Sequence, residues 1–344
     1  MSPERLQQIE ELYNDALALA PGERQSFLDR ACGADTDLRR EIDSLLMSAT
    51  VETCLDREAI DFAAESLAKH ADDVLMGRML GRYQLLSLVG RGGMGDVYCG
   101  VDTRLNRLVA VKVLPSYLSG NVEWAERVEQ EARAIASLNH PHICTLYDIG
   151  KDAGMHYLVF EYLIGERLSD RLPKGALPPA EAVRYAMQMA EALDATHQEG
   201  IVHCDLKPHN IILTRTGLKL LDFGIAELRH ADEKALASNG RSPGTLKYMA
   251  PEQIQGRETD VRTDIFAFGL VTYEMVTGRP AFQGVNQTAL ADSILNDSPL
   301  VASQLVTRVP PALDFLLTRC LAKNPSERWQ SIRDVLFLLK WISA

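Results

Sequence analysis

Residues 203–210 read His203-Cys204-Asp205-Leu206-Lys207-Pro208-His209-Asn210, and Leu221-Asp222-Phe223-Gly224 follows shortly after. Five given residue types at fixed spacing would occur by chance in about one chain in 10⁴ of this length. An ordinary surface loop does not need this combination of carboxylate, ammonium and amide side chains. The two runs therefore predict a catalytic site.

The side chains of these runs carry the groups that a phosphoryl transfer requires. That reaction needs one carboxylate near the attacking hydroxyl and separate oxygen ligands that hold Mg²⁺ against phosphate oxygens. Asp205 fits the first role, whereas Asn210 and Asp222 fit the second. Lys207 follows Asp205 closely and can neutralise charge on the transferring group.

A glycine-rich run lies upstream, between two strand-like segments. After Val89 it reads Gly90-Arg91-Gly92-Gly93-Met94-Gly95-Asp96-Val97. Three glycines at this spacing are a weak signal alone, and an ordinary hairpin is the alternative interpretation. The dinucleotide-binding fingerprint is excluded, because it opens a helix whereas this run returns into a strand. Glycines lack a Cβ atom, so backbone N–H groups here can close over phosphates.

Lys112 ends the strand-like run Val109-Ala110-Val111-Lys112. A lysine in a strand is more often a solvated edge residue, so a functional role requires a carboxylate partner. Glu131, on the helix predicted to follow, can hold the ammonium toward the α- and β-phosphates. Glu126 and Glu129 of the same helix are alternative partners.

The order of these patterns predicts an α+β protein with a small β-rich lobe followed by a larger helical lobe. A cleft between the two lobes is the expected place for a ligand. The predicted strands cover 83–90, 96–102, 108–115, 143–150 and 155–163. The predicted helices are Trp124–Leu138, Ala180–Gln198, Asp264–Thr277, Gln287–Leu295, Pro311–Leu321 and Ser331–Ile342.

Residues 1–75 are interpreted as a separate module. They carry 17 acidic and 7 basic residues, a net charge of −10, whereas the whole chain has −11. Apolar residues recur at helical spacing, which predicts three or four short helices, with Asp35 or Thr36 capping the third. The acidity argues against nucleic-acid binding. It fits either a solubilising appendage or a module that docks on a basic partner or on the chain's own second domain.

A linker at 76–82 then leads into one domain at 83–342, with lobes at 83–162 and 163–342. No run of 18 apolar residues and no signal peptide is present, so no membrane segment is predicted. The six cysteines lack CxxC spacing, which is typical of reduced thiols and predicts a cytoplasmic protein without structural zinc. Membrane anchoring is expected only if the natural protein continues beyond Ala344.

Taken together, residues 82–342 resemble a eukaryotic-type protein kinase domain, in the manner of bacterial serine/threonine kinases that carry an N-terminal helical extension. The resemblance implies a bilobal kinase fold that uses ATP with Mg²⁺, or Mn²⁺ as an alternative. The matching positions, in family order, are Gly90, Gly92, Gly95, Lys112, Glu131, 203–210, 222–224, Ala250-Pro251-Glu252, Asp264 and Arg328.

Further roles follow from the resemblance by position. The adenine is expected between Val97, Ala110 and the hinge Glu161–Leu163, behind a gatekeeper at Phe160. Glu252 and Arg328 are expected to form a buried ion pair that fixes the substrate-binding segment.

Lys207 and Thr245 match the serine/threonine form of these motifs, which implies protein substrates with Ser or Thr hydroxyls, autophosphorylation and a role in signalling. A pseudokinase that binds nucleotide without transferring phosphate is the alternative, although every catalytic position is filled. A small-molecule kinase is disfavoured by the complete peptide-docking motif at 244–252.

Cys204 departs from the family pattern, which has arginine before the catalytic aspartate. In relatives that arginine binds a phosphate on the activation segment, here 222–252, and orders it. Cysteine cannot do so, although Ser238 and Ser242 remain available for phosphorylation. We therefore expect that pairing with an activation-loop phosphate does not control this protein.

Overall fold

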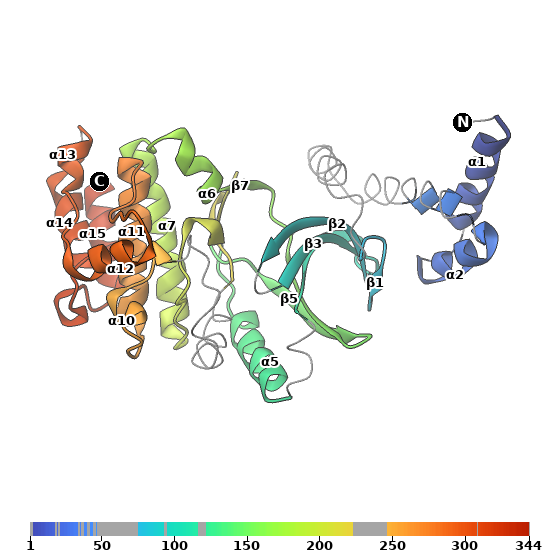
Figure 1. Cartoon of the computed structure of the whole chain (residues 1–344), viewed down its shortest axis with the longest axis horizontal. Coiled ribbons are helices and arrows are strands. Elements are labelled where there is room, and N and C mark those ends of the chain that lie inside the picture. The colour runs from blue at the N-terminus through green and yellow to red at the C-terminus, as the bar shows by residue number, and fades with distance from the viewer. Residues whose placement is uncertain are drawn as a thin grey trace. The chain divides into compact units, whose positions relative to one another are not determined.

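Figure 1 shows the computed structural model of the chain. It describes residues 3–17, 19, 21–33, 35, 38–39, 42–43, 46, 75–92, 95–115, 122–222, 246–307 and 309–343. The chain divides into two compact units. The first unit comprises Met1–Asn121 and Tyr147–Ile164, and the second comprises Val122–Leu146 and Gly165–Ala344.

The N-terminal segment forms helices α1 (Pro3–Leu17) and α2 (Pro21–Cys32). Their apolar faces and a following helical segment share a small buried core, made of Ile9, Ala16, Leu28, Cys32, Leu38, Ile42 and Leu46. The backbone N–H of Leu38 donates to Asp35 Oδ1 at 2.9 Å, which is the bond expected of an N-cap. Asp35 is therefore the cap, while Thr36 and residues 47–74, where a fourth helix would lie, are outside the described residues.

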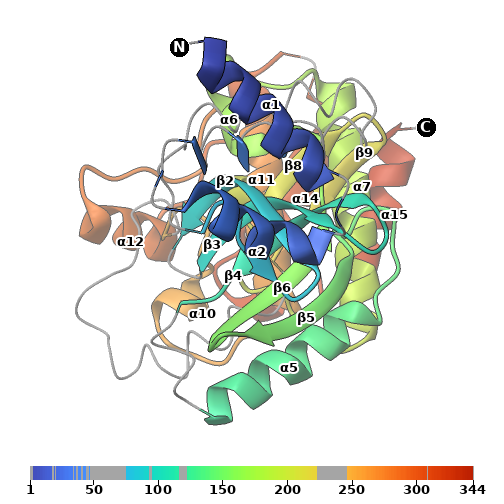
Figure 2. The same cartoon turned by 90° about the vertical axis from the view of Figure 1, so that its right-hand side faces the viewer.

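The first unit also contains a six-stranded sheet, in the order β1-β2-β3-β4-β6-β5. Figure 2 shows β2, β3, β4, β6 and β5 following one another across it. The strands are β1 (Met79–Leu80), β2 (Tyr83–Gly92), β3 (Gly95–Asp102), β4 (Arg107–Val113), β5 (Leu146–Asp152) and β6 (Met155–Glu161). All five predicted strands are present, and β1 adds a short edge within the segment that we interpreted as a linker.

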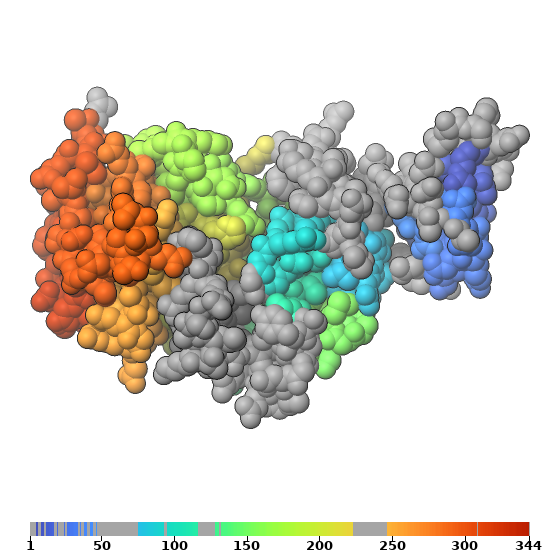
Figure 3. Space-filling view, viewed as in Figure 1, coloured from blue at the N-terminus to red at the C-terminus, as the bar shows by residue number. Residues whose placement is uncertain are grey.

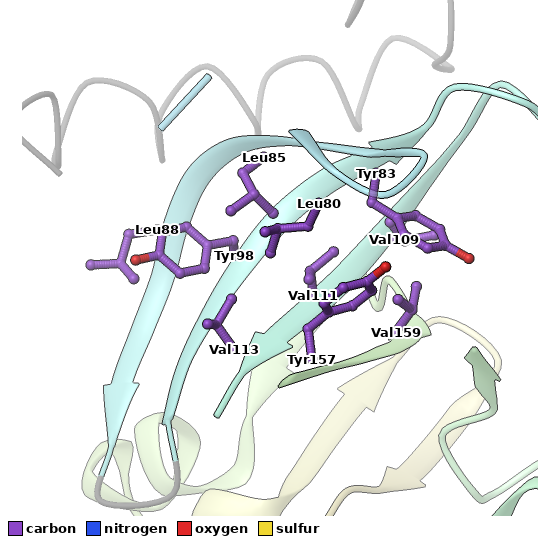
Figure 4. Close-up of a cluster of buried hydrophobic side chains, with 10 residues drawn as sticks. All are labelled: Leu80, Tyr83, Leu85, Leu88, Tyr98, Val109, Val111, Val113, Tyr157 and Val159. Carbon is purple, nitrogen blue, oxygen red and sulfur yellow. The ribbon is translucent and has the colours of Figure 1, made fainter. Parts of the chain in front are cut away.

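One face of this sheet is covered by a hydrophobic cluster (Figure 4), whose members are Leu80, Tyr83, Leu85, Leu88, Tyr98, Val109, Val111, Val113, Tyr157 and Val159. In β4 the alternate residues Val109, Val111 and Val113 point into it, because successive side chains of a strand face opposite sides. Ala110 and Lys112 consequently lie on the other face.

The second unit is mostly helical. Its helices are α5 (Val122–Ala136), α6 (Leu168–Arg171), α7 (Pro179–Gln198), α10 (Pro251–Ile254), α11 (Val261–Thr277), α12 (Gln287–Asn296), α13 (Ala302–Leu305), α14 (Pro311–Cys320) and α15 (Ile332–Ser343). Short 3₁₀ turns are η2 (Leu172–Lys174), η3 (Pro208–Asn210) and η4 (Pro325–Glu327). Helix α7 packs against α11, α15 and β9, and α10 to α15 form one continuous body, orange to red in Figure 3.

Helix α11 is mostly apolar and almost fully buried, as a central helix of a large core should be. It begins three residues earlier than predicted, because Asp260 accepts a bond from the Arg262 N–H and Thr263 completes a capping box. It ends at Gly278, whose φ of +67° is the left-handed conformation that favours glycine.

A three-stranded sheet, which the sequence patterns did not predict, lies in the second unit. It consists of β7 (Gly165–Arg167), β8 (Ile211–Thr214) and β9 (Gly217–Leu220), in the order β7-β8-β9. β8 and β9 lie between the two motif runs at 203–210 and 221–224. The hairpin thus positions the end of the first run beside the start of the second.

Among the helices of the described residues, none is both long enough and apolar enough to span a membrane.

Candidate active site

The loop at 203–210 is anchored to helix α11 by the buried carboxylate of Asp264. Its Oδ2 accepts the backbone N–H of His203 at 2.8 Å, and its Oδ1 accepts that of Cys204 at 2.9 Å. His197 at the end of α7 contacts the same carboxylate through Nε2 at 2.8 Å. Three groups from two other segments therefore converge on one side chain, which fixes where the loop leaves the helical core.

Cys204 adopts a left-handed conformation with φ of +59°, which is uncommon for a residue with a side chain. Such a conformation costs about 1–2 kcal/mol and persists where neighbours hold it. Asp264 binds the Cys204 N–H, and Gln253 Nε2 donates to the Cys204 carbonyl at 2.8 Å. Gln253 Oε1 also accepts the N–H of Ala250 at 2.9 Å, so one buried amide connects α10 to the loop.

His203 is fully buried and connects the two motif runs. Its Nε2 lies 3.0 Å from the Leu221 carbonyl, and its Nδ1 lies 3.3 Å from the Asp205 N–H. A neutral ring with the proton on Nε2 satisfies both contacts, because one nitrogen then donates and the other accepts.

Asp205, Lys207 and Asn210 form a hydrogen-bonded group. Lys207 Nζ lies 2.9 and 2.8 Å from the two carboxylate oxygens of Asp205. Asn210 Nδ2 donates to the Asp205 backbone carbonyl at 2.9 Å and to its Oδ2 at 3.1 Å. These contacts orient the carboxylate. Within the described residues, no donor binds the side-chain amide oxygen of Asn210.

Asp222 lies directly beyond the β8–β9 hairpin. The Leu221 N–H donates to the Asn210 carbonyl at 2.9 Å, so the backbone next to Asp222 lies beside Asn210. Asp222 also has a left-handed backbone, with φ of +55°. Phe223 and Gly224 lie outside the described residues.

The surroundings of His209 report the electrostatics next to this group. Partial desolvation lowers the pKa of its imidazole, and the cationic Arg167 and Lys207 lower the pKa further. Asp222 and Asp170 act in the opposite sense. Positive charge therefore outweighs negative charge at this imidazole.

Glu252 and Arg328 form the predicted buried ion pair. Arg328 Nη1 and Nη2 donate to Oε1 and Oε2 of Glu252, each at 2.7 Å. Thr263 Oγ1 donates to Glu252 Oε1 at 2.8 Å. Burial acts to raise the pKa of Glu252, but Arg328 holds it below its ordinary value. The segment that begins at Ala250 is thereby fixed to the helical core.

In the first unit, the strand register places four predicted nucleotide-binding side chains on one face of the sheet. Val97 opposes Lys112, and Ala110 opposes Phe160. Directly opposed residues of antiparallel strands point to the same side. This face is the one opposite the hydrophobic cluster of Figure 4. Lys112 is only 4% exposed, so the alternative of a solvated edge lysine is wrong.

The glycine-rich run is a β-hairpin that joins β2, which includes Val89, to β3. The register pairs Gly90 with Val97, Arg91 with Asp96 and Gly92 with Gly95. Gly95 has φ of +117°, and a Cβ atom there would lie 2.1 Å from the Val113 carbonyl oxygen. Glycine is therefore required at this position. Gly93 and Met94, at the tip, lie outside the described residues.

The remaining predicted site residues are placed as follows. Glu161 ends β6 opposite Val109, and Leu163 follows that strand. Glu131 lies within helix α5, but its side chain is outside the described residues, as is Thr245. The choice among Glu131, Glu126 and Glu129 thus stays a prediction.

Sequence reasoning did not assign roles to His197 or Gln253. Gln253 binds the loop from α10, and His197 of α7 contacts the Asp264 carboxylate that holds the loop. Their partners are distant in the sequence, and neither residue belongs to a run with recognisable spacing. Only the packing of α7, α10 and α11 around the loop reveals them.

A sheet of antiparallel strand pairs that carries a glycine hairpin and a buried lysine, together with a helical unit that carries the Asp205–Asn210 loop, defines a protein kinase domain. A family model described as the protein kinase domain matches residues 83–337. The chain therefore belongs to the protein kinase domain family.

Bacterial relatives are similar over the same region. The serine/threonine-protein kinase PknD of Mycobacterium tuberculosis is 41% identical over 263 residues, which cover 76% of this chain and 39% of PknD. A probable serine/threonine-protein kinase of Clostridium perfringens is 37% identical over 265 residues, covering 76% of this chain and 38% of the relative. The chain thus spans less than half the length of these relatives.

The fold is also similar to a solved structure, the crystal structure of the Mycobacterium tuberculosis PknI kinase domain. The TM-score is 0.61 at 27% sequence identity, and the match covers 78% of this chain and 99% of that domain. The bilobal kinase fold predicted from the motifs is confirmed.

Proposed function

We propose that this protein transfers the γ-phosphate of Mg·ATP to serine or threonine hydroxyls of proteins, including its own. The observation that carries the proposal is the bonded group of Asp205, Lys207 and Asn210, joined to Asp222 through the Leu221 N–H. The relatives are named serine/threonine kinases, and Lys207 follows the form of the loop found in that class.

Asp205 is proposed to accept the proton of the attacking hydroxyl. Its carboxylate is oriented by Lys207 and Asn210, so its direction is set before substrate binds. Lys207 can turn from Asp205 to the transferring phosphoryl group and offset its developing charge.

Asn210 and Asp222 fit a Mg²⁺ ion, because amide and carboxylate oxygens are hard ligands of the kind that this ion prefers. The amide nitrogen of Asn210 is committed to Asp205, which directs its oxygen to an outside partner. When bound, Mg²⁺ would neutralise charge on the β- and γ-phosphate oxygens. Mn²⁺ has similar ligand preferences and is the alternative ion.

The first unit is proposed to bind the nucleotide. Val97 and Ala110 would contact the adenine, Phe160 would act as gatekeeper, and Glu161 to Leu163 would form the hinge. Lys112 would bind the α- and β-phosphates with Glu131 as its partner. The hairpin from Val89 to Val97, including Arg91, Gly93, Met94 and Asp96, would cover the phosphates with backbone N–H groups.

Three substitutions test this proposal. Lys112→Met, Asp205→Asn and Asp222→Ala are each expected to reduce phosphate transfer at least about a hundredfold, or about 2.7 kcal/mol. Asp222→Ala should also weaken Mg-dependent ATP binding, whereas Asp205→Asn should leave ATP binding nearly intact, because only the base is changed. Asp334→Asn, an exposed acid on α15, is the control.

The measurements are transfer of labelled phosphate and equilibrium ATP binding. Near-normal turnover in any of the three variants would contradict the assignment of that residue. A wild-type protein that binds Mg·ATP but transfers nothing would instead establish the pseudokinase alternative.

A further inference from the structure

An arginine and a histidine next to the candidate base form a contact that the proposed transfer does not use. Arg167 ends strand β7, and its Nη1 lies 2.8 Å from His209 Nε2 and 3.4 Å from Nδ1. His209 belongs to the turn η3, one residue before Asn210 and four after Asp205. β7 and α6 both contact this turn, so the pair is part of the loop's immediate surroundings.

Among the residues that the structure describes, no carboxylate pairs with the guanidinium of Arg167. Four other arginines of the second unit pair with acids: Arg184 with Glu181, Arg262 with Asp260, Arg328 with Glu252 and Arg333 with Asp194. Within the described residues, the Arg167 guanidinium instead donates to an imidazole, which supplies no negative charge. Its other N–H donors have no acceptor in the described part of the chain and can bind an outside acceptor.

The nearby acids do not fill this role. Asp170 accepts a bond from Ser169 Oγ at 3.2 Å on its own short helix, and Glu166 pairs with Lys174. The carboxylate of Asp205 is paired with Lys207. His209 is exposed and Arg167 is half-buried, so a ligand from solution can reach both side chains.

We propose that Arg167 and His209 form a subsite for an acidic or phosphorylated side chain of the protein substrate, close to the hydroxyl that Asp205 activates. The inference rests on the proposed function. A guanidinium binds carboxylate and phosphate through parallel N–H bonds, and the anion would supply the charge that Arg167 lacks. The protein would thus prefer substrates in which an acidic residue lies close to the phosphorylated Ser or Thr, and it would disfavour substrates with a basic residue there.

The test uses peptides with a single serine in an alanine background, with Glu, phosphoserine, Ala or Lys placed in turn at each flanking position. The readout is the ratio of kcat/KM for the Glu or phosphoserine peptide to that for the Lys peptide. We expect a ratio of about ten or more at one or two adjacent positions, since a charge-assisted bond contributes on this scale. The Glu and phosphoserine series distinguish a carboxylate site from a phosphate site.

The charge-reversed double variant Arg167→Glu, His209→Glu should invert this ratio. The matched control is Arg171→Glu, four residues further on, whose guanidinium donates to the Gly175 carbonyl; it should keep the wild-type ratio. A wild-type ratio near one, or an equal loss in the control, would overturn the proposal. A changed KM for ATP with an unchanged peptide ratio would assign the pair to the nucleotide and overturn it as well.

A protein that transfers no phosphate to any peptide would refute the proposed function without deciding the subsite. Fluorescence anisotropy of labelled Glu and Lys peptides then decides it. Preferential binding of the Glu peptide by wild type, lost in the double variant, supports the subsite, and equal binding of both peptides refutes it.

Discussion

The Glu252–Arg328 pair allows the sharpest prediction about what holds the candidate site in place. Arg328 is 1% exposed, and besides binding Glu252 it donates to the carbonyls of Ala322, Arg262 and Lys323. The substitution Arg328→Met keeps most of the side-chain volume but removes all of these bonds. Glu252 is then left buried with only Thr263 as a donor among the described side chains.

We expect Arg328→Met to reduce the free energy of unfolding by about 3–5 kcal/mol, the cost of leaving one partner of a buried pair uncompensated. The matched control is Arg333→Met on α15. Arg333 contacts Asp194 at 3.1 Å, but its side chain is 64% exposed. Because solvent screens such a pair, the control should lose at most about 1 kcal/mol.

Denaturant unfolding followed by tryptophan fluorescence measures this difference, since Trp124, Trp329 and Trp341 all lie in the second unit. The midpoint should shift while the slope m is unchanged. Equal losses for the two variants would refute the reasoning that burial makes the first pair important.

The pH dependence has a definite sign. In wild type the folded pKa of Glu252 is lowered, so the stability it contributes is complete above the unfolded pKa and is lost as pH falls through the folded one. In Arg328→Met the carboxyl is buried without its cation, which raises its folded pKa, so the variant loses stability as pH rises. The gap between the two proteins should therefore be wider at about pH 8 than at about pH 5. A gap independent of pH would contradict this account.

Two further predictions concern regulation. Phosphatase-treated protein should retain kcat within about tenfold, or about 1.4 kcal/mol, of the phosphorylated form, because Cys204 cannot bind an activation-loop phosphate; a larger drop would show that a phosphate switch operates without arginine. Deleting residues 1–75 removes a net charge of −10 and should change activity or its salt dependence if this module docks on a basic surface. Unchanged activity, partner affinity and salt dependence would favour the solubilising appendage.

The long elements of the fold were predictable from the sequence because their periodicity extends over many residues. Strands such as β4 and helices such as α7 repeat apolar positions often enough to identify the element and its buried face. The sheet β7-β8-β9 was not predicted, since strands of three or four residues are too short for alternation to stand out. The start of α11 was missed because its cap precedes the apolar run.

The same distinction, between residues close together and residues far apart in the sequence, applies to the candidate site. Asp205, Lys207 and Asn210 were predicted because they lie in one short run, and the structure brings them into one hydrogen-bonded group. Gln253 contacts the loop at Cys204, 49 residues away, and His197 contacts Asp264, 67 residues away, which in turn holds the loop. Single residues at such separations have no periodic or motif signal, so only the folded chain identifies them.

The structure also gives a physical reason why the departure at Cys204 bears on regulation more than on the loop's geometry. The Cys204 N–H is held by Asp264 from α11, and its carbonyl is held by Gln253 from α10. Both bonds involve the backbone, so they form with any side chain that tolerates the left-handed conformation. The thiol lies 3.7 Å from Thr259 Oγ1.

Because Gln253 also binds the N–H of Ala250 at the start of the α10 segment, an uncharged amide connects that segment to the loop. This connection requires no phosphate, and it is the reason to expect the unphosphorylated protein to be competent.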